Sequence, residues 1–336
     1  MEIKQERFID LLGRNGTRFV IPVFQRVYSW NARQCEELWG DIMTTGARGA
    51  DEPHFMGMLL CMPDSESWQG TEQLDVIDGQ QRMTTLTLLL CALARFLDEN
   101  DASAGGHSAS DLLTRFLRTG DVGKLALSSM DRDTLFALVG VSAMPEEPAG
   151  RLIDNLELFF GKMQEAGFDA EQLWRGIEQL EVASVLLAHD DSPQLVFESL
   201  NSKGMALALA DRVRNFIVVS DNANGTAGLF EKSWQPLERL VAHSDDHAVT
   251  AAMTAWLAGT FRDVRIFDES EVYGVFKRCL REEFHDDVAA LLADVAAYAE
   301  KLLGDETLRA EELENAERWT AGKPKDLISE YKMFGD

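Results

Sequence analysis

The chain of 336 residues has no run of 18 or more apolar residues, and its first six residues, MEIKQE, lack the apolar stretch of a signal peptide. Neither a membrane-spanning helix nor a secretory leader is therefore predicted, and the expected location is the cytoplasm. Cysteine is scarce and scattered, because the four thiols form no C-x-x-C pair. That spacing argues against a disulfide framework and against the usual zinc sites.

Several familiar catalytic motifs are also missing. The sequence has no GxxxxGK[ST] phosphate loop, no GxGxxG fingerprint, no GxSxG elbow and no HExxH zinc motif. A histidine-asparagine-histidine nuclease constellation is missing too, since only His285 follows Tyr273. His243 and His247 are four residues apart, but with no cysteine nearby a surface position is favoured over a metal site. Cutting DNA would need residues that this chain lacks.

Positive charge is scarce overall, since 32 lysines and arginines face 57 aspartates and glutamates and give a net charge of −25. The one clear basic region is the N-terminal segment, where residues 1–35 hold six basic and three acidic side chains. Electrostatic contacts with DNA come from local patches, so the net charge does not exclude a nucleic-acid partner. It does disfavour strong non-specific binding.

The hydrophobic pattern predicts mixed strands and helices over the first hundred residues. Asn31 is a typical N-cap, which places a helix start directly after it. The predicted elements are helices over 4–13, 31–43 and 83–97 and strands over 18–23, 54–62 and 73–77.

Residues 98–110, rich in Asp, Ser, Ala and Gly, are the best candidate linker. Beyond them helical spacing dominates, interrupted by one strand-like run over 182–188. The later predicted helices cover 111–118, 130–139, 150–166, 170–180, 191–200 and 209–219, and everything from 229 to 319 is expected to be helical. The fold class predicted is α+β. We expect a small mixed core from residues 1–97 and 181–220, a helical insertion over 98–180 and a C-terminal helical part over 221–336.

The segment Asp78-Gly79-Gln80-Gln81-Arg82 joins a predicted strand to a predicted helix. A turn of this kind leaves free backbone N–H groups at the helix start, which form an anion site. In a nucleotide site, Gly79 lets a phosphate approach the backbone and Arg82 neutralises its charge. Asp78 can hold Mg²⁺ or orient water, and Gln80 or Gln81 can position the attacking water. The alternative is a plain helix cap, but five such residues in a row favour function.

A second cluster lies in the segment 21–30, where Gln25, Arg26, Tyr28 and Trp30 fall between a strand and a helix. Arginine suits phosphate, glutamine can bind a base edge or a phosphate oxygen, and aromatic rings stack on bases. The alternative is that Tyr28 and Trp30, together with the neighbouring phenylalanine, pack the core. On its own, this cluster favours that structural interpretation.

A third cluster follows the predicted helix over 191–200. Asn201, Lys203 and Asp211 could line one pocket. A helix C-terminus with a left-handed Gly204, followed by a new helix with Asp211 in its first turn, explains these residues equally well.

Taken in order, these motifs resemble the N-terminal domain of GmrSD-type restriction proteins, which has a ParB/sulfiredoxin-like core. The resemblance covers about residues 8–216. Its motifs here are Ile21-Pro22-x-Phe24-Gln25-Arg26-x-Tyr28-x-Trp30, Phe55-x-Gly57, Ile77-Asp78-Gly79-Gln80-Gln81-Arg82-Met83-Thr84-Thr85-Leu86, and Phe197-Glu198-x-Leu200-Asn201-x-x-Gly204 with Asp211. Where the family often has tyrosine, this chain has Phe24, which lacks the hydroxyl.

The resemblance implies a role in phage defence, with nucleotide binding and hydrolysis at the Asp-Gly-Gln-Gln-Arg motif and a nuclease domain that cuts DNA. The layout is most similar to family members that sense phosphorothioate-modified double-stranded DNA and hydrolyse GTP. On that basis the chain is expected to end before its nuclease domain and to use Mg²⁺ and GTP, and a homo-oligomer is among the expected partners. The expected residues are catalytic Asp78, Gln80, Gln81 and Arg82, nucleotide-binding Gly79, Thr84, Asn201, Lys203 and Asp211, and DNA-binding Phe24, Gln25, Arg26, Tyr28 and Trp30. A non-hydrolysing module that binds modified DNA is the alternative.

Overall fold

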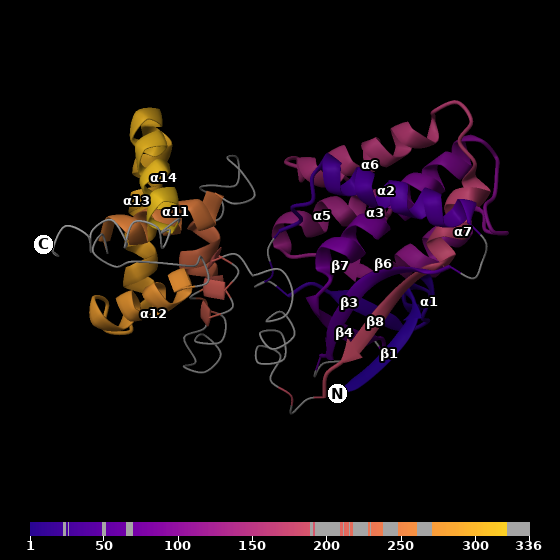
Figure 1. Cartoon of the computed structure of the whole chain (residues 1–336). Helices are drawn as coiled ribbons and strands as arrows, with labels where there is room; N and C mark the ends of the chain where they lie inside the picture. Colours follow the sequence, from indigo (N-terminus) through magenta and orange to yellow (C-terminus); the bar gives the residue numbers. More distant parts are fainter. Residues whose placement is uncertain are drawn as a thin grey trace, which may run out of the picture. The chain divides into compact units, whose positions relative to one another are not determined.

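The computed structural model divides into two compact units, Met1–Leu200 and Asn201–Asp336, which we describe separately (Figure 1). The structure describes residues 1–22, 25, 27–48, 52–64, 70–188, 191, 209–210, 212–214, 216–217, 228, 230–237, 248–260 and 271–320.

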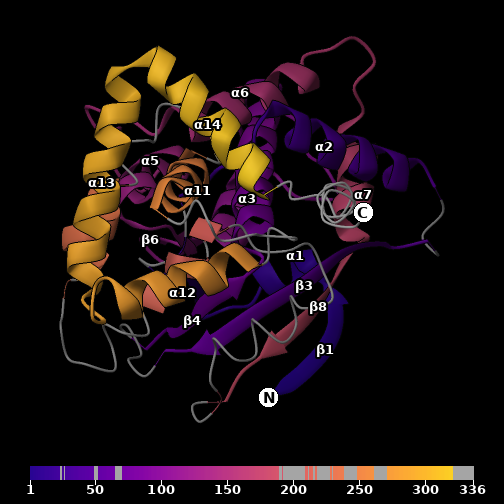
Figure 2. The same ribbon diagram turned by 60° about the vertical axis from the view of Figure 1, so that its left-hand side comes forward.

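The first unit is built on a mixed sheet. Within the described residues six strands pair in the order β1-β8-β3-β4-β2-β7. They are β1 (Glu2–Arg7), β2 (Thr17–Val20), β3 (His54–Pro63), β4 (Glu72–Asp78), β7 (Leu125–Ala126) and β8 (Leu180–Leu186). Figure 2 shows β1, β8, β3 and β4 side by side, as their pairing requires. The predicted α+β class is confirmed.

The directions of the strands bring the loop after β2 and the turn after β4 to the same edge of this sheet. Strands β4 and β7 both run parallel to β2, while β3 runs antiparallel to β4. The carboxyl ends of β2, β4 and β7 and the first half of β3 therefore meet at the same edge. The loop after β2 and the turn after β4 both leave from there.

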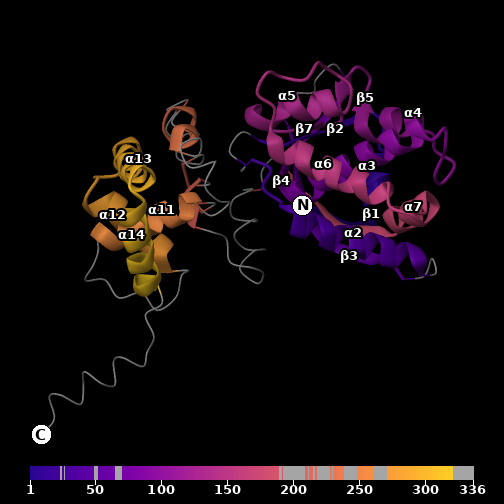
Figure 3. The same ribbon diagram turned by 90° about the horizontal axis from the view of Figure 1, so that it is seen from above.

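Helices cover the sheet. Those of the first unit are α1 (Phe8–Leu12), α2 (Ala32–Ala47), α3 (Gln80–Glu99), α4 (Ala109–Leu112), α5 (Ser129–Leu138), α6 (Gly150–Met163) and α7 (Ala170–Glu178), with a π-helix over Leu113–Leu117. Helix α3 packs beside α6, and α2 packs against α7 (Figure 3). Helix α2 begins as predicted, because the Asn31 side chain accepts hydrogen bonds from the backbone of residues 33 and 34.

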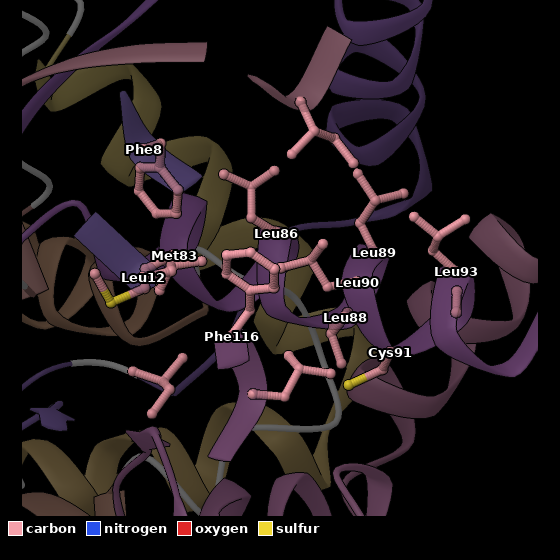
Figure 4. Close-up of a cluster of buried hydrophobic side chains, with 14 of the residues drawn as sticks. Phe8, Leu12, Met83, Leu86, Leu88, Leu89, Leu90, Cys91, Leu93 and Phe116 are labelled. Carbon is pink, nitrogen blue, oxygen red and sulfur yellow. The ribbon is translucent and has the colours of Figure 1, made fainter. Parts of the chain in front are cut away.

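Helix α3 runs through the centre of the core. Its residues from Met83 to Ala94 are all buried, which is typical of a helix enclosed on every side (Figure 4). Phe8 and Leu12 of α1 and Phe116 of the π-helix belong to the same cluster. Each fully buried leucine of this kind contributes about 1.5–3 kcal/mol to the stability of the fold relative to an exposed one. Burial of these side chains therefore holds α3, and with it the helix start, in its place in the core.

The structure corrects several predicted elements. The predicted helix over 4–13 is in fact strand β1 followed by the short helix α1. Helix α3 starts at Gln80 rather than at residue 83, so the polar turn forms its first turn. The short strands β5 (Arg118–Thr119), β6 (Val122–Gly123) and β7 were not predicted. Residues 98–110 lie within the first unit, and Ala104 among them is fully buried.

The described part of the second unit is helical, in agreement with the predicted helices over 229–319. It contains a π-helix (Phe230–Trp234), α11 (Ala248–Thr260), α12 (Val272–Glu282), α13 (Val288–Gly304) and α14 (Glu306–Thr320). A small apolar cluster joins α11, α13 and α14. In the described parts of both units, no helix is long and apolar enough to cross a membrane.

Candidate functional site

The start of α3 has the geometry of an anion site. Gly79 occupies the N-cap position with φ 92°, and no side chain caps the helix. The first helical hydrogen bond runs from the Met83 N–H to the Gly79 carbonyl, so the N–H groups of the three residues between them have no acceptor inside the helix. Such groups, together with the helix dipole, favour a negatively charged ligand.

Gln80 and Asp78 stand at this helix start. The Gln80 side chain is buried, at 8% exposure, and within the described part of the chain it forms no hydrogen bond. The Asp78 side chain is 31% exposed, and one of its carboxylate oxygens lies 3.6 Å from an Arg82 nitrogen. Both predicted catalytic side chains therefore retain polar atoms that a ligand can use.

Arg82 is turned toward β3. Its guanidinium donates to the Met56 carbonyl and, over 2.6 Å, to the Met58 carbonyl. Burial lowers the pKa of the Arg82 guanidinium, and the Asp78 carboxylate acts against that shift. Arg82 therefore joins the start of α3 to a neighbouring strand, and its contact with phosphate stays a prediction.

Two glycines lie close to the Arg82 guanidinium. Gly57 lies where the pairing of β3 with β8 shifts register, and it has φ 96°. A Cβ atom there would lie 2.6 Å from an Arg82 nitrogen, and one at Gly79 would lie 2.7 Å from Leu59 Cδ1. Both positions combine a left-handed backbone with a close approach, which only glycine satisfies.

Gln81 is turned toward the loop after β2. Its side-chain oxygen accepts from the Ser29 N–H over 2.8 Å, and its amide nitrogen donates to the Val27 carbonyl over 3.2 Å. Both ends of the amide are thus engaged with the backbone. In this arrangement Gln81 fixes a loop, and a role in positioning water stays a prediction.

The predicted DNA-binding residues lie in different surroundings. Tyr28 is 6% exposed, and its hydroxyl lies 2.8 Å from Thr85 Oγ1 and 2.9 Å from Asn155 Nδ2. Burial raises the pKa of Tyr28. The Gln25 amide donates to the Ile77 carbonyl over 2.9 Å, and Trp30 packs half-buried against the core. The structure therefore brings the predicted loop to the predicted turn, but it places the Tyr28 ring inside the core.

Of the remaining predicted residues, the structure describes only Thr84. Thr84 is 1% exposed in α3, with no surface for a nucleotide in this arrangement. Five predicted residues lie outside the described part of the chain: Phe24, Arg26, Asn201, Lys203 and Asp211. The residue pair His243 and His247 lies outside it as well.

Two residues that sequence reasoning missed complete this region. Asp131 of α5 accepts from the Tyr28 N–H over 2.7 Å, and Asn155 of α6 donates to the Trp30 carbonyl over 2.7 Å. Burial raises the pKa of Asp131 to about 6, and the hydrogen bond from the Tyr28 N–H opposes this rise. Both residues are separated from the loop by more than a hundred positions, so no local pattern could indicate them.

The donor set for a metal is small. Among the described residues no group of three or more His, Cys, Asp and Glu side chains could hold an ion. Mg²⁺ in nucleotide sites is commonly held by one or two carboxylates together with phosphate oxygens. The partly exposed Asp78 carboxylate fits that limited requirement.

Comparison with known proteins identifies the family of the region that contains this site. The family model described as "GmrSD restriction endonuclease, N-terminal domain" matches residues 8–218, which include both the loop and the turn. A comparison with curated proteins gave no match. Since the matched region exceeds half of the chain, the chain belongs to the family of GmrSD restriction endonuclease N-terminal domains and is a module of a restriction, or phage-defence, system.

Proposed function

We propose that this chain is a nucleoside triphosphatase domain, with GTP favoured, that senses phosphorothioate-modified DNA and controls a nuclease domain. The nucleotide phosphates would bind at the start of α3. The observation that carries the proposal is the combination found there: N–H groups without helical acceptors and a buried Gln80 side chain with no hydrogen bond in the described part of the chain. A phosphate would supply acceptors for all of them.

The chemistry divides among few side chains. Asp78 would hold Mg²⁺, which when bound neutralises charge on the phosphates. Gln80 would hydrogen-bond a phosphate oxygen or orient the attacking water. Gln81 and Arg82 would act by fixing the backbone around the nucleotide, since their side chains bind the Ser29 N–H and the Met58 carbonyl.

The loop after β2 would contact the DNA. Sulfur is larger and less well hydrated than oxygen. Moving a phosphorothioate sulfur into a partly apolar recess with a cation therefore costs less desolvation free energy than moving a phosphate oxygen there. Trp30 and Gln25 would form the described part of that recess. Phe24 and Arg26 belong to the proposal on sequence grounds.

The test is phosphate release from GTP and from ATP, with and without phosphorothioate duplex DNA. Asp78→Asn should reduce release by about a hundredfold or more if Asp78 holds the metal. Asp75→Asn, three residues earlier in β4, is the matched control and should leave release unchanged. No release by the wild-type chain under any of these conditions would exclude hydrolysis.

A second function has one observation in its favour. Because Gln81 and Arg82 are engaged with backbone groups, fewer side chains remain for catalysis. A module that binds modified DNA and holds a phosphate without turnover would need no more than the helix start. Binding of phosphorothioate DNA without any phosphate release would support this alternative, and equal affinity for plain DNA would exclude sensing in both.

A further inference from the structure

Four consecutive residues, Val27 to Trp30, are held by side chains from three helices. Gln81 of α3 binds the first and third of these residues through the Val27 carbonyl and the Ser29 N–H. The backbones of the other two residues, Tyr28 and Trp30, are held from α5 and α6. Asp131 accepts the Tyr28 N–H over 2.7 Å, and Asn155 binds the Trp30 carbonyl over 2.7 Å.

Asp131 and Asn155 are buried polar residues, and Asp131 also lies in the first turn of α5, where the helix dipole favours a carboxylate. They are 7% and 2% exposed, and burying a carboxylate or an amide costs free energy that an apolar side chain would not. Within the described residues, the hydrogen bonds of both side chains go only to the segment Val27–Trp30: one from Asp131 and two from Asn155. The side-chain hydrogen bonds of these two residues therefore act on the conformation of that segment.

The position of the segment gives this conformation a consequence. Gln25, two residues before Val27, is tied to the Ile77 carbonyl at the end of β4. The segment is tied to the start of α3 by Gln81. Fixing the segment therefore fixes the proposed DNA-contacting loop against the proposed nucleotide site.

We infer that Asp131 and Asn155 are positioning residues for the DNA-contacting loop, so that the region predicted as a helical insertion is part of the binding site. The expected effect on DNA binding rests on the proposed function. The expected effect on the conformation of the segment Val27–Trp30 can be measured without DNA.

Two readouts test it. Hydrogen exchange of the Tyr28 and Ser29 amides reports the segment itself, and fluorescence anisotropy with a phosphorothioate duplex reports binding. Asp131→Ala and Asn155→Ala should speed exchange at the segment while α3 stays protected, and should weaken binding roughly tenfold. Asp131→Asn keeps an acceptor oxygen and should restore both readouts.

The control is Leu135→Ala, one turn further along α5, where the leucine is fully buried. Leu135→Ala should lower the melting temperature at least as much as Asp131→Ala or Asn155→Ala does. It should nevertheless leave the affinity for the duplex within about twofold of the wild type. Binding that follows the melting temperature through all the variants, or unchanged exchange at Tyr28 in Asp131→Ala, would overturn the inference. If the wild type binds no modified DNA while exchange responds as expected, the proposed function fails and the positioning stands.

Discussion

Arg82 shows how one side chain can connect three parts of a fold. It lies in the first turn of α3, pairs with Asp78 at the end of β4 and donates to two carbonyls of β3. From sequence, an arginine after Asp-Gly-Gln-Gln indicates phosphate. A Cβ atom at Gly57 would collide with the guanidinium, so the observed position of Arg82 also depends on that glycine.

At the same scale, Asp75 of β4 predicts a pH dependence of stability. Burial, with a smaller repulsion from Asp64, raises the pKa of Asp75 to about 6. Because the folded state holds this proton more tightly than the unfolded state, the contribution of Asp75 to stability is lost as pH rises through 6. The free energy of unfolding should therefore fall between pH 4 and pH 7 by about 1–2 kcal/mol more in the wild type than in Asp75→Asn, allowing for partial exposure.

Urea unfolding at a series of pH values measures this difference. Asp64→Asn, which removes the repulsion but keeps Asp75, should give an intermediate slope. A gap between wild type and Asp75→Asn that stays constant with pH would contradict the assignment.

At the scale of elements, the crossing of α2 and α7 depends on two glycines. A Cβ at Gly46 would lie 1.9 Å from the Gln172 carbonyl oxygen, and one at Gly176 would lie 2.1 Å from the Ile42 carbonyl oxygen. The Gln172 amide also donates to the Met43 carbonyl over 2.9 Å. The two helix backbones are therefore closer than side chains would allow.

Gly46→Ala should consequently lower the free energy of unfolding by about 1–3 kcal/mol, because the helices must separate. Gly40 lies in the same helix with open space around it, so Gly40→Ala should raise the free energy of unfolding by about 0.5–1 kcal/mol. Thermal and urea unfolding of both variants measure the effect. Equal effects at the two positions would show that close packing does not limit this crossing.

Local signals predicted many of these elements, and distant contacts decided those that were missed. Asn31 was recognisable as an N-cap from sequence, and β3, β4 and β8 were indicated by their apolar runs. Strand β1 was not, because residues 2–7, EIKQER, have one apolar side chain and become a strand only by pairing with β8. In the site, the turn after β4 was predictable, whereas Asp131 and Asn155 reach the loop only through the tertiary fold.

At the scale of the whole molecule, the charge of −25 limits how the chain can bind DNA. The positive side chains of residues 1–35 are few, and some are already paired: Arg14 with Glu6, and Arg33 with Glu37. An acidic molecule with a small basic region depends on release of counterions from DNA for its affinity. In the proposed function, specificity would then come from the loop after β2 rather than from overall charge.

Binding of duplex DNA should therefore be weak and steeply dependent on salt. With three or four phosphate contacts, affinity should fall roughly 40- to 150-fold between 50 and 200 mM salt. Replacing the exposed Arg33 by glutamine should make the logarithmic slope shallower by about one unit if Arg33 binds a phosphate. A tight complex that does not respond to salt would contradict this electrostatic account.

The place of β8 in the sheet affects how the protein is made. Strand β8 lies between β1 and β3, and Arg7 pairs with Glu181, which is 174 positions later in the chain. At about 5–20 residues per second, a ribosome needs roughly 10–35 s to make that stretch. Until then β1 has no partner in this sheet, and β3 lacks one of its neighbours. The sheet of the first unit can therefore form completely only after most of that unit has been translated. Any activity that needs the complete sheet is delayed until then.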